Sequence, residues 1–263
     1  MGESVTFNCD CMEYMKTLPD GFFDLAVVDP PYGDGLHAED GGGKGWFTKY
    51  NQKAEDSLYN TEHRNLRGRF DRYNDAEACS QSVQVERERA DGGPARTGGT
   101  WAEKYGKKII AWDVAPEESY FTELFRVSRN QIIWGGNFFR LPPTRCFLVW
   151  RKLSITENFS MAMAEYAWTS FNSNAKVFEH VPQGKPGDRF HPTQKPVAMY
   201  KWILQHYAKP GDKIFDSHMG SQSSRIAAWD MGFDYWGCEI DKTYYDLGEK
   251  RFQAHTSQTR MDL

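Results

Sequence analysis

The stretch FFDLAVVDPPYGDG, residues 22–35, joins an apolar run to an acid, two prolines and an aromatic side chain. Residues 24–28 have the length and composition of a buried strand. The consecutive prolines end such a strand because proline has no backbone N–H to donate. In open parallel sheets, ligands bind outside the carboxyl ends of the strands, so DPPY lies where a site is expected. Taken by themselves, these four residues are equally typical of a turn.

Similar apolar runs alternate with amphipathic segments along the rest of the chain. This alternation is typical of an α/β protein with a parallel sheet. We therefore predict an α/β fold, formed as a single domain over residues 1–263, with a mostly parallel, twisted sheet and helices on both faces. The other predicted strands are 131–134, 146–150, 166–171, 212–216 and 234–240, with the start of one more at Val5–Phe7, and the predicted helices are 11–18, 116–127, 196–208 and 223–231.

The composition of the chain places few limits on its function. The 32 lysines and arginines against 36 acids give a net charge of -4, so a nucleic-acid surface would have to come from local clustering. The five cysteines contain no CxxC pair, which argues against a disulfide framework and a structural zinc site, and we predict no metal. No apolar run approaches the roughly 18 residues that span a bilayer, so we expect a cytoplasmic protein without membrane contact.

Residues 34–100 interrupt the alternation, because they are polar, charged and rich in glycine. We interpret them as an insertion that is mobile when alone. Within it, four arginines are interleaved with Phe70 and Tyr73, a mixture suited to phosphate contact and base stacking. A solvated helix face is an equally good interpretation. The four arginines are Arg64, Arg67, Arg69 and Arg72.

The residues that follow the first strand offer two hydrogen-bond acceptors and a ring. Asp29 is an anionic acceptor, the Pro30 carbonyl is a second acceptor, and Tyr32 has a flat face. This combination suits a planar amino group. The position of the segment at a strand end favours a site over a simple turn.

Two segments near the carboxyl end of the chain have the features of a nucleotide site. Residues 213–224 run from a predicted strand through a Gly/Ser-rich turn into a helix, whose first turn lets a ligand approach the backbone. Glu239, at the end of the next strand, can accept hydrogen bonds from a ribose diol. A tight α/β crossover gives the same pattern without a ligand. The other segment, HPTQKP at residues 191–196, is by itself a polar start to a helix.

Together and in this order, the three segments DPPY, HPTQKP and DSHMGSQSS resemble the β-class DNA amino-methyltransferases. These enzymes use S-adenosylmethionine to methylate adenine N6 or cytosine N4. The stretch NQIIWGGNFF, residues 130–139, resembles a phage-like adenine-N6 branch. The resemblance covers most of the chain. It implies a Rossmann-like methyltransferase fold that is circularly permuted, with the catalytic half first and the cofactor half last.

The resemblance also assigns roles to individual residues. The catalytic loop is the segment after the first strand, and the cofactor S-adenosylmethionine is held by the later segments and by the start of the first helix. The implied catalytic residues are Asp29, Pro30, Pro31 and Tyr32, and the implied cofactor residues are Asp10 and the Cys11 backbone at the adenine, Glu239 at the ribose, Gly220 and Ser221 at the methionine end, and Thr193, Gln194, Lys195, Asp216 and His218 around them.

The sequence departs from the family pattern in two places. The family's cofactor loop reads close to DPFxGSGTT, so His218 replaces an aromatic residue and Gln222 replaces the second glycine, which puts cofactor affinity in question. The segment 172–190, where β-class enzymes usually carry their target-recognition region, is short. Sequence recognition is therefore expected elsewhere, and the insertion after the catalytic loop is the obvious place.

The function implied is site-specific methylation of N6 of an adenine flipped out of DNA. Methylation of cytosine N4 is the nearest alternative, and a DNA-binding relic without catalysis or a methyltransferase acting on RNA or protein are more distant ones. DNA is the implied partner. Family members also form homodimers and pair with restriction endonucleases, but the residues of this chain indicate neither.

Overall fold

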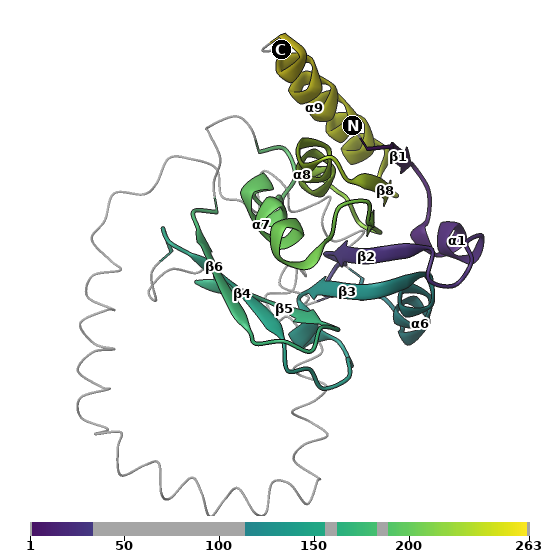
Figure 1. Ribbon diagram of the computed structural model, residues 1–263, viewed down its shortest axis with the longest axis vertical. Coiled ribbons are helices and arrows are strands. Elements are labelled where there is room, and N and C mark those ends of the chain that lie inside the picture. Colours follow the sequence, from purple (N-terminus) through teal and green to yellow (C-terminus); the bar gives the residue numbers. More distant parts are fainter. Residues whose placement is uncertain (1, 34–113, 156–161, 183–188, 262–263) are drawn as a thin grey trace, which may run out of the picture. The chain divides into compact units, whose positions relative to one another are not determined.

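The helices and strands described all belong to one compact unit, made of residues 1–32 and 114–263. The predicted insertion, residues 34–100, and its four arginines lie outside the described residues, so the single-domain organisation stays a prediction. The computed structural model, drawn in Figure 1, describes residues 2–33, 114–155, 162–182 and 189–261.

An eight-stranded sheet forms the centre of this unit, with the strand order β1-β8-β7-β2-β3-β5-β4-β6. Only β5 runs against its neighbours β3 and β4, and the other pairs are parallel. The predicted mostly parallel sheet is therefore confirmed. The strands are β1 (Ser4–Phe7), β2 (Phe23–Val28), β3 (Ser128–Trp134), β4 (Phe147–Lys152), β5 (Ala164–Thr169), β6 (Lys176–His180), β7 (Lys213–Asp216) and β8 (Asp234–Cys238).

Helices cover both faces of the sheet, as predicted (Figure 1). A hydrophobic core lies on each face of the sheet, and alternate residues of β2 point into one core or the other. Leu25 and Val27 pack with α7 and α8, whereas Ala26 and Val28 pack with α1 and α6. The helices are α1 (Cys11–Lys16), α6 (Glu118–Val127), α7 (Val197–Tyr207), α8 (Ser223–Met231) and α9 (Lys242–Met261), and a short 3-10 helix, η1 (Gly136–Phe138), follows β3.

Local sequence explains where several helices begin and end. Asp10 caps α1 by accepting a hydrogen bond from the Met12 N–H at 2.8 Å. Gly232 ends α8 in the left-handed conformation, with φ of 76°, which glycine adopts at little cost. Pro196 is the residue before α7 rather than part of its first turn, because its ψ of 139° is extended.

Besides the short η1, one strand and one helix were not predicted, and both have weak apolar patterns. Strand β6 is an edge strand in which Lys176, Val177 and Glu179 are exposed, so it lacks the continuous apolar run of a central strand. Helix α9 has 20 residues, of which Tyr244 and Phe252 are the buried hydrophobic ones among the side chains described. A helix with so few buried positions shows no clear apolar stripe in the sequence.

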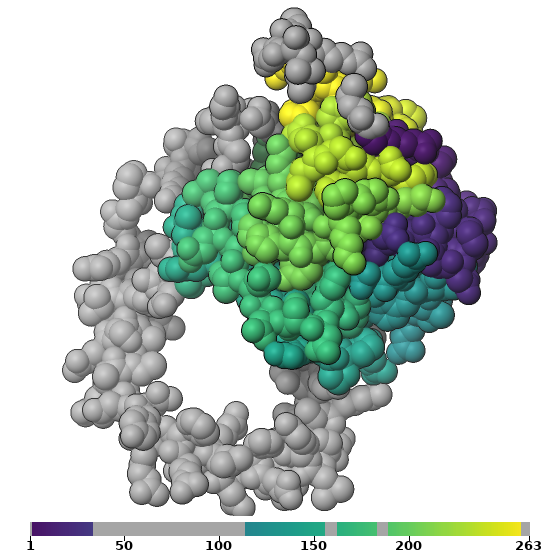
Figure 2. All heavy atoms as spheres, viewed as in Figure 1, coloured from purple at the N-terminus to yellow at the C-terminus, as the bar shows by residue number. Residues whose placement is uncertain are grey.

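The first strand, β1, and the last strand described, β8, are neighbours in the sheet. Strand β1 pairs in parallel with β8, with Ser4 opposite Tyr235 and Phe7 opposite Cys238. In Figure 2 the purple N-terminal atoms lie beside the yellow-green C-terminal ones. This contact brings the start of α1 next to the loop that follows β8.

The residue ranges given above contain neither a membrane-spanning helix nor a cluster of metal ligands. No helix there is long and apolar enough to cross a bilayer. Within the same ranges, no three His, Cys, Asp or Glu side chains are grouped so as to hold a metal ion. Cys9, Cys11, Cys146 and Cys238 are free thiols.

Candidate active site

Asp29 follows the carboxyl end of β2, and both of its carboxylate oxygens have partners. Oδ1 accepts a hydrogen bond from the Tyr32 hydroxyl at 2.7 Å. Oδ2 forms an ion pair with the Lys195 ammonium, which comes from HPTQKP. The Asp29 side chain is 12% exposed. The predicted catalytic loop and the HPTQKP segment are thus joined through one carboxylate.

The segment after β3 holds the ring of Tyr32. Phe138 stacks on this ring with a centroid distance of 4.8 Å and an angle of 11°, and Phe139 meets it edge-on at 6.2 Å. Gly135 has φ of 67°, and a Cβ atom there would overlap the Tyr32 ring. The sequence reasoning did not assign Gly135 or Phe138 to the site, although both lie in the IWGGNFF stretch that carried part of the resemblance. Burial and the nearby Asp29 raise the pKa of Tyr32, so its phenol is neutral and can donate.

Lys195 lies between two carboxylates. Besides Asp29, its Nζ is 3.4 Å from Oε2 of Glu165 in β5, and Glu165 Oε1 is 2.7 Å from Nζ of Lys152 in β4. Burial would lower the pKa of Lys195, but the Asp29 and Glu165 carboxylates outweigh it and raise this pKa. The resemblance placed Lys195 among the cofactor residues, whereas its ammonium contacts the catalytic loop. Sequence reasoning missed Glu165 and Lys152, which lie on strands and carry no motif.

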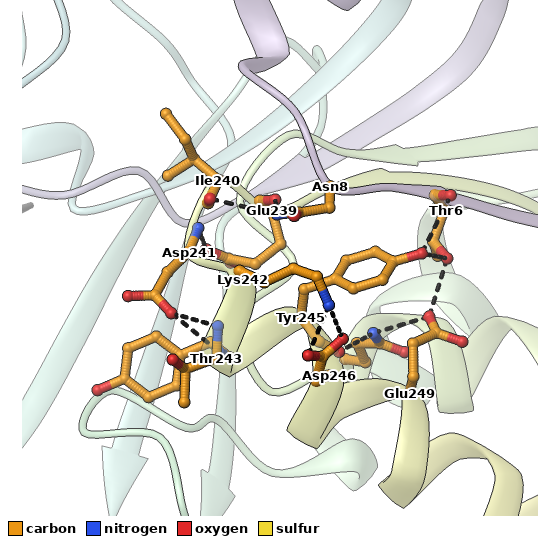
Figure 3. Close-up of polar contacts among 12 residues, drawn as sticks. Thr6, Asn8, Glu239, Ile240, Asp241, Lys242, Thr243, Tyr245, Asp246 and Glu249 are labelled. Carbon is orange, nitrogen blue, oxygen red and sulfur yellow. Dashed lines mark hydrogen bonds and ion pairs between the residues drawn. The ribbon is translucent and has the colours of Figure 1, made fainter.

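Glu239 follows β8 and is held by backbone groups. Its Oε2 accepts the N–H of Gly220 and its Oε1 accepts the N–H of Asp241, each at 2.9 Å. Asn8, which precedes α1, donates to the backbone carbonyls of Glu239 and Ile240 at 2.8 and 3.2 Å (Figure 3). Burial raises the pKa of Glu239 to about 6, against the opposing effect of the two N–H donors. These contacts bring the segment containing Asp10 and Cys11 to the same end of the sheet as Glu239.

The loop between β7 and α8 is organised around a buried acid. Asp216 accepts hydrogen bonds from the His218 N–H at 3.0 Å and the Ser224 hydroxyl at 2.6 Å. Burial raises the pKa of Asp216 to about 7. Gly220 has φ of 43°, and a Cβ atom there would lie 3.1 Å from His191 Nε2, so His191 packs closely on the loop.

The remaining residues of HPTQKP contact one another. The Thr193 hydroxyl is 3.2 Å from His191 Nδ1, and the Gln194 N–H donates to the His191 carbonyl at 3.3 Å. Burial lowers the pKa of His191 to about 3, which keeps its ring neutral. On the loop, the Ser221 carbonyl accepts a hydrogen bond from Arg251 of α9 at 2.7 Å. The segment therefore forms a compact turn against the loop.

Both departures from the family loop are accommodated by neighbouring residues. Among the described residues other than glycine, Gln222 has a positive φ, of 58°. It therefore adopts the conformation that glycine takes most easily. Its side chain is fully buried against α9, where its Nε2 donates to Glu249 at 3.1 Å. His218 hydrogen-bonds Ser217 at 2.8 Å and packs edge-on against Tyr120 at 5.5 Å. Burial lowers the pKa of His218 to about 4, so a neutral ring stands in the place of the family's aromatic residue.

The fold and site together define a Rossmann-like α/β protein with its candidate site at the carboxyl ends of the central strands. The family model described as DNA methylase, which covers N6 and N4 methyltransferases, matches residues 102–250. The chain belongs to this family, and it is a DNA methyltransferase of the N6/N4 group.

Two relatives agree with this assignment, and a solved structure agrees with the fold. The chain is 23% identical to the Type II methyltransferase M.HinfI of Haemophilus influenzae, over 93% of this chain and 67% of that protein. It is 24% identical to the Type II methyltransferase M2.MboI of Moraxella bovis, over 94% of this chain and 86% of that protein. The structure of the cytosine-N4-specific PvuII DNA methyltransferase is similar in fold, with a TM-score of 0.51 at 10% identity, over 98% of this chain and 91% of that one.

Proposed function

We propose that this DNA methyltransferase transfers a methyl group from S-adenosylmethionine to N6 of an adenine in DNA. The observation that carries the proposal is the position of Asp29, an acceptor at the end of β2 that is joined through Lys195 to the HPTQKP segment. HPTQKP in turn packs on Gly220 of the predicted cofactor loop. Three segments far apart in the sequence therefore support one site.

The described residues fit S-adenosylmethionine. Gly220 has no side chain that would separate a ligand from the loop backbone, and Glu239 is fixed by backbone donors at the end of the neighbouring strand. We propose Glu239 for the ribose, Gly220 and Ser221 for the methionine end, and Asp10 with the Cys11 backbone for the adenine. When bound, the cofactor supplies a methyl group that is already activated on a positively charged sulfur.

The catalytic loop would act on the amino group of the target base. A base within a duplex is out of reach, so it must flip out, at a cost of a few kcal/mol. Its amino group then donates hydrogen bonds to Asp29 and the Pro30 carbonyl, which stabilise the positive charge that develops on the nitrogen. The nitrogen lone pair would take up the activated methyl group, while the electron pair of the broken carbon–sulfur bond would remain with the departing cofactor. One N–H proton passes to Asp29 and from there to solvent.

The choice of adenine rests on the resemblance, in which Asp as the first residue of the motif favours adenine over cytosine. Cytosine N4 stays the alternative, since the N6/N4 family includes both activities. The two are separated by incubating unmethylated DNA with the protein and labelled S-adenosylmethionine. Digestion and mass spectrometry of the nucleosides should give N6-methyladenine, and N4-methylcytosine would contradict the adenine proposal.

The role of Asp29 can be tested with Asp29→Ala. Loss of the acceptor should lower the methylation rate by roughly 100-fold or more. Binding of S-adenosylmethionine, measured by calorimetry, should persist because Asp29 is not among the proposed cofactor residues. Asp20→Ala is the control, because Asp20 is 83% exposed and pairs with Arg126 away from the site. Normal turnover in the Asp29 variant would contradict the role.

Parts of the sequence interpretation stay predictions. These are the homodimer, a cognate restriction endonuclease, the cytoplasmic location and the DNA contacts of the four arginines. The contacts of the arginines can be tested by the salt dependence of DNA affinity.

A further inference from the structure

Each carboxylate oxygen of Asp29, the proposed acceptor for the target amino group, already has one partner. Tyr32 donates to one oxygen, and Lys195 forms an ion pair with the other. Each oxygen has a second lone pair, but the Lys195 ammonium neutralises the charge of the carboxylate, so an amino group that donates to Asp29 is held more strongly when this ammonium withdraws. Tyr32 is also held by the stacked ring of Phe138. Lys195 is the partner with a second acceptor nearby.

That second acceptor is Glu165. Its Oε2 is already 3.4 Å from Lys195 Nζ, so the ammonium needs to move only a short way to leave Asp29 while remaining paired. The other oxygen of Glu165 contacts Lys152 at 2.7 Å. The four side chains form a neutral cluster of two carboxylates and two ammonium groups, and Lys195 and Lys152 are 4% and 6% exposed. A buried ammonium is stable only while it keeps a partner.

We propose that Glu165 is a positioning residue for methyl transfer, which acts by drawing Lys195 away from Asp29 when the target amino group binds. This inference rests on the proposed function. Lys195 is then a counter-ion shared by two carboxylates, and Asp29 becomes available as an acceptor without leaving a buried charge unpaired. Lys152 remains on the far oxygen of Glu165 and limits how strongly Glu165 attracts Lys195.

The surroundings of the cluster are consistent with a guided movement. The Lys195 ammonium lies 5.5 Å from the centroid of the Trp134 ring, a distance at which a cation is attracted to the ring face. Lys195 and Lys152 together lower the pKa of Glu165, although burial opposes them, so this carboxylate is charged and ready to receive the ammonium. Glu165 is 26% exposed and lies opposite Trp150 in the pairing of β4 and β5, which fixes its height on the sheet.

The test uses Glu165→Gln, which keeps the size of the side chain and removes its charge. Lys195 should then stay on Asp29, so kcat for methylation of unmethylated DNA should fall about tenfold or more. The affinity for S-adenosylmethionine should remain near that of wild type, whereas the melting temperature should fall, because the buried Lys152 loses its carboxylate partner. Glu165→Asp should recover part of the rate. Glu179→Gln is the matched control, because Glu179 is a half-exposed carboxylate paired with Arg151 on the same part of the sheet.

A second variant gives a prediction of opposite sign. In Lys152→Gln, Glu165 loses its other cation and attracts Lys195 more strongly, so Asp29 is released more easily. Its kcat should equal or exceed that of wild type, whereas a purely structural cluster would lose activity in both variants. Wild-type kcat in Glu165→Gln, or parallel losses of kcat and melting temperature in both variants, would overturn the inference. If wild type itself fails to methylate DNA, the proposed function fails instead, before any variant is compared.

Discussion

Gln222 shows how a residue that departs from a family pattern is compensated. A left-handed conformation costs a residue with a side chain about 1–2 kcal/mol relative to glycine. Here the side chain gains hydrogen bonds with Glu249 at 3.1 Å and Arg225 at 2.8 Å. Gly248 of α9 provides the space, because a Cβ atom there would lie 2.7 Å from the Gln222 side chain. Gln222 and Gly248 are therefore a matched pair.

This pairing predicts that Gly248→Ala changes the free energy of unfolding in opposite directions in wild type and in a Gln222→Gly variant. Gly248→Ala in wild type should lower the free energy of unfolding by about 1–3 kcal/mol, because the added methyl group meets Gln222. In a Gln222→Gly background the same change should raise it by up to about 1 kcal/mol, since alanine is the better helix former. Urea unfolding of the four proteins measures both values. Equal effects in the two backgrounds would contradict the pairing.

Asp216 gives the protein a pH-dependent stability. Its pKa of about 7 in the folded state is raised above the unfolded value, so its contribution is full below about pH 4 and is lost as the pH rises towards 7. The difference in unfolding free energy between wild type and Asp216→Asn should therefore shift against wild type by about 2–3 kcal/mol from pH 5 to pH 8. Glu239, His191 and His218 titrate in both proteins, so the difference isolates Asp216. A difference that stays constant with pH would refute the assignment.

At the scale of elements, side chains of α9 hold the proposed cofactor loop through hydrogen bonds. Glu249 accepts a hydrogen bond from Thr6 of β1 (Figure 3). It also accepts hydrogen bonds from Gln222 and Arg225 around the start of α8. Arg251 donates to the Ser221 carbonyl. The polar composition of α9 is the reason that it was not predicted from the sequence. The same polar side chains bind backbone and polar groups of the loop rather than a hydrophobic core.

Glu249→Ala should be strongly destabilising, since it leaves Arg225, which is 7% exposed, without its carboxylate partner. We expect the free energy of unfolding to fall by about 3 kcal/mol. Hydrogen exchange at residues 217–222 should become faster as the loop loses its support. Asp246→Ala on the same helix removes the exposed pair with Lys242 and should cost less than about 0.5 kcal/mol. Equal effects of the two changes would show that the Glu249 network contributes little.

At the scale of the whole molecule, the pairing of β1 with β8 is what makes the permuted order workable. Because these two strands are neighbours, the segment of Asp10 and the loop of Glu239 lie together although they are far apart in the sequence. The proposed catalytic loop after β2 is followed in the sequence by the predicted insertion, residues 34–100, where we propose the DNA-contacting arginines. Placing recognition there agrees with the short segment 172–190.

The arginine proposal predicts a change in salt dependence. When Arg64, Arg67, Arg69 and Arg72 are replaced by glutamine, DNA affinity should fall, and the slope of log affinity against log salt should decrease by about 0.9 for each arginine that contacts a phosphate. Affinity for S-adenosylmethionine should not change. Filter binding over a range of salt concentrations measures the slope. An unchanged slope would mean that these arginines do not contact the DNA backbone.

Central strands and their adjoining loops could be predicted from sequence because burial on both faces requires continuous apolar runs. The predicted bounds of β2 and of β7, the strand before DSHMGSQSS, are therefore close to the observed ones. The helices next to these strands were also predicted close to their observed bounds. The edge strand β6 and the polar helix α9 were missed, since elements with one covered side leave little pattern.

The sequence by itself determined the parallel α/β architecture, the permuted order of its halves and the residues of the three motifs. Each strand, helix and motif is a contiguous stretch of residues, so its pattern and its place in the order can be recognised without the structure. Only the tertiary structure decided that Lys195 contacts Asp29, 166 residues away, that Glu165 and Lys152 complete this cluster, and that Gln222 fits against Gly248. These contacts join side chains from separate strands and helices. Their distances depend on how the sheet and helices pack, and no local pattern encodes that packing.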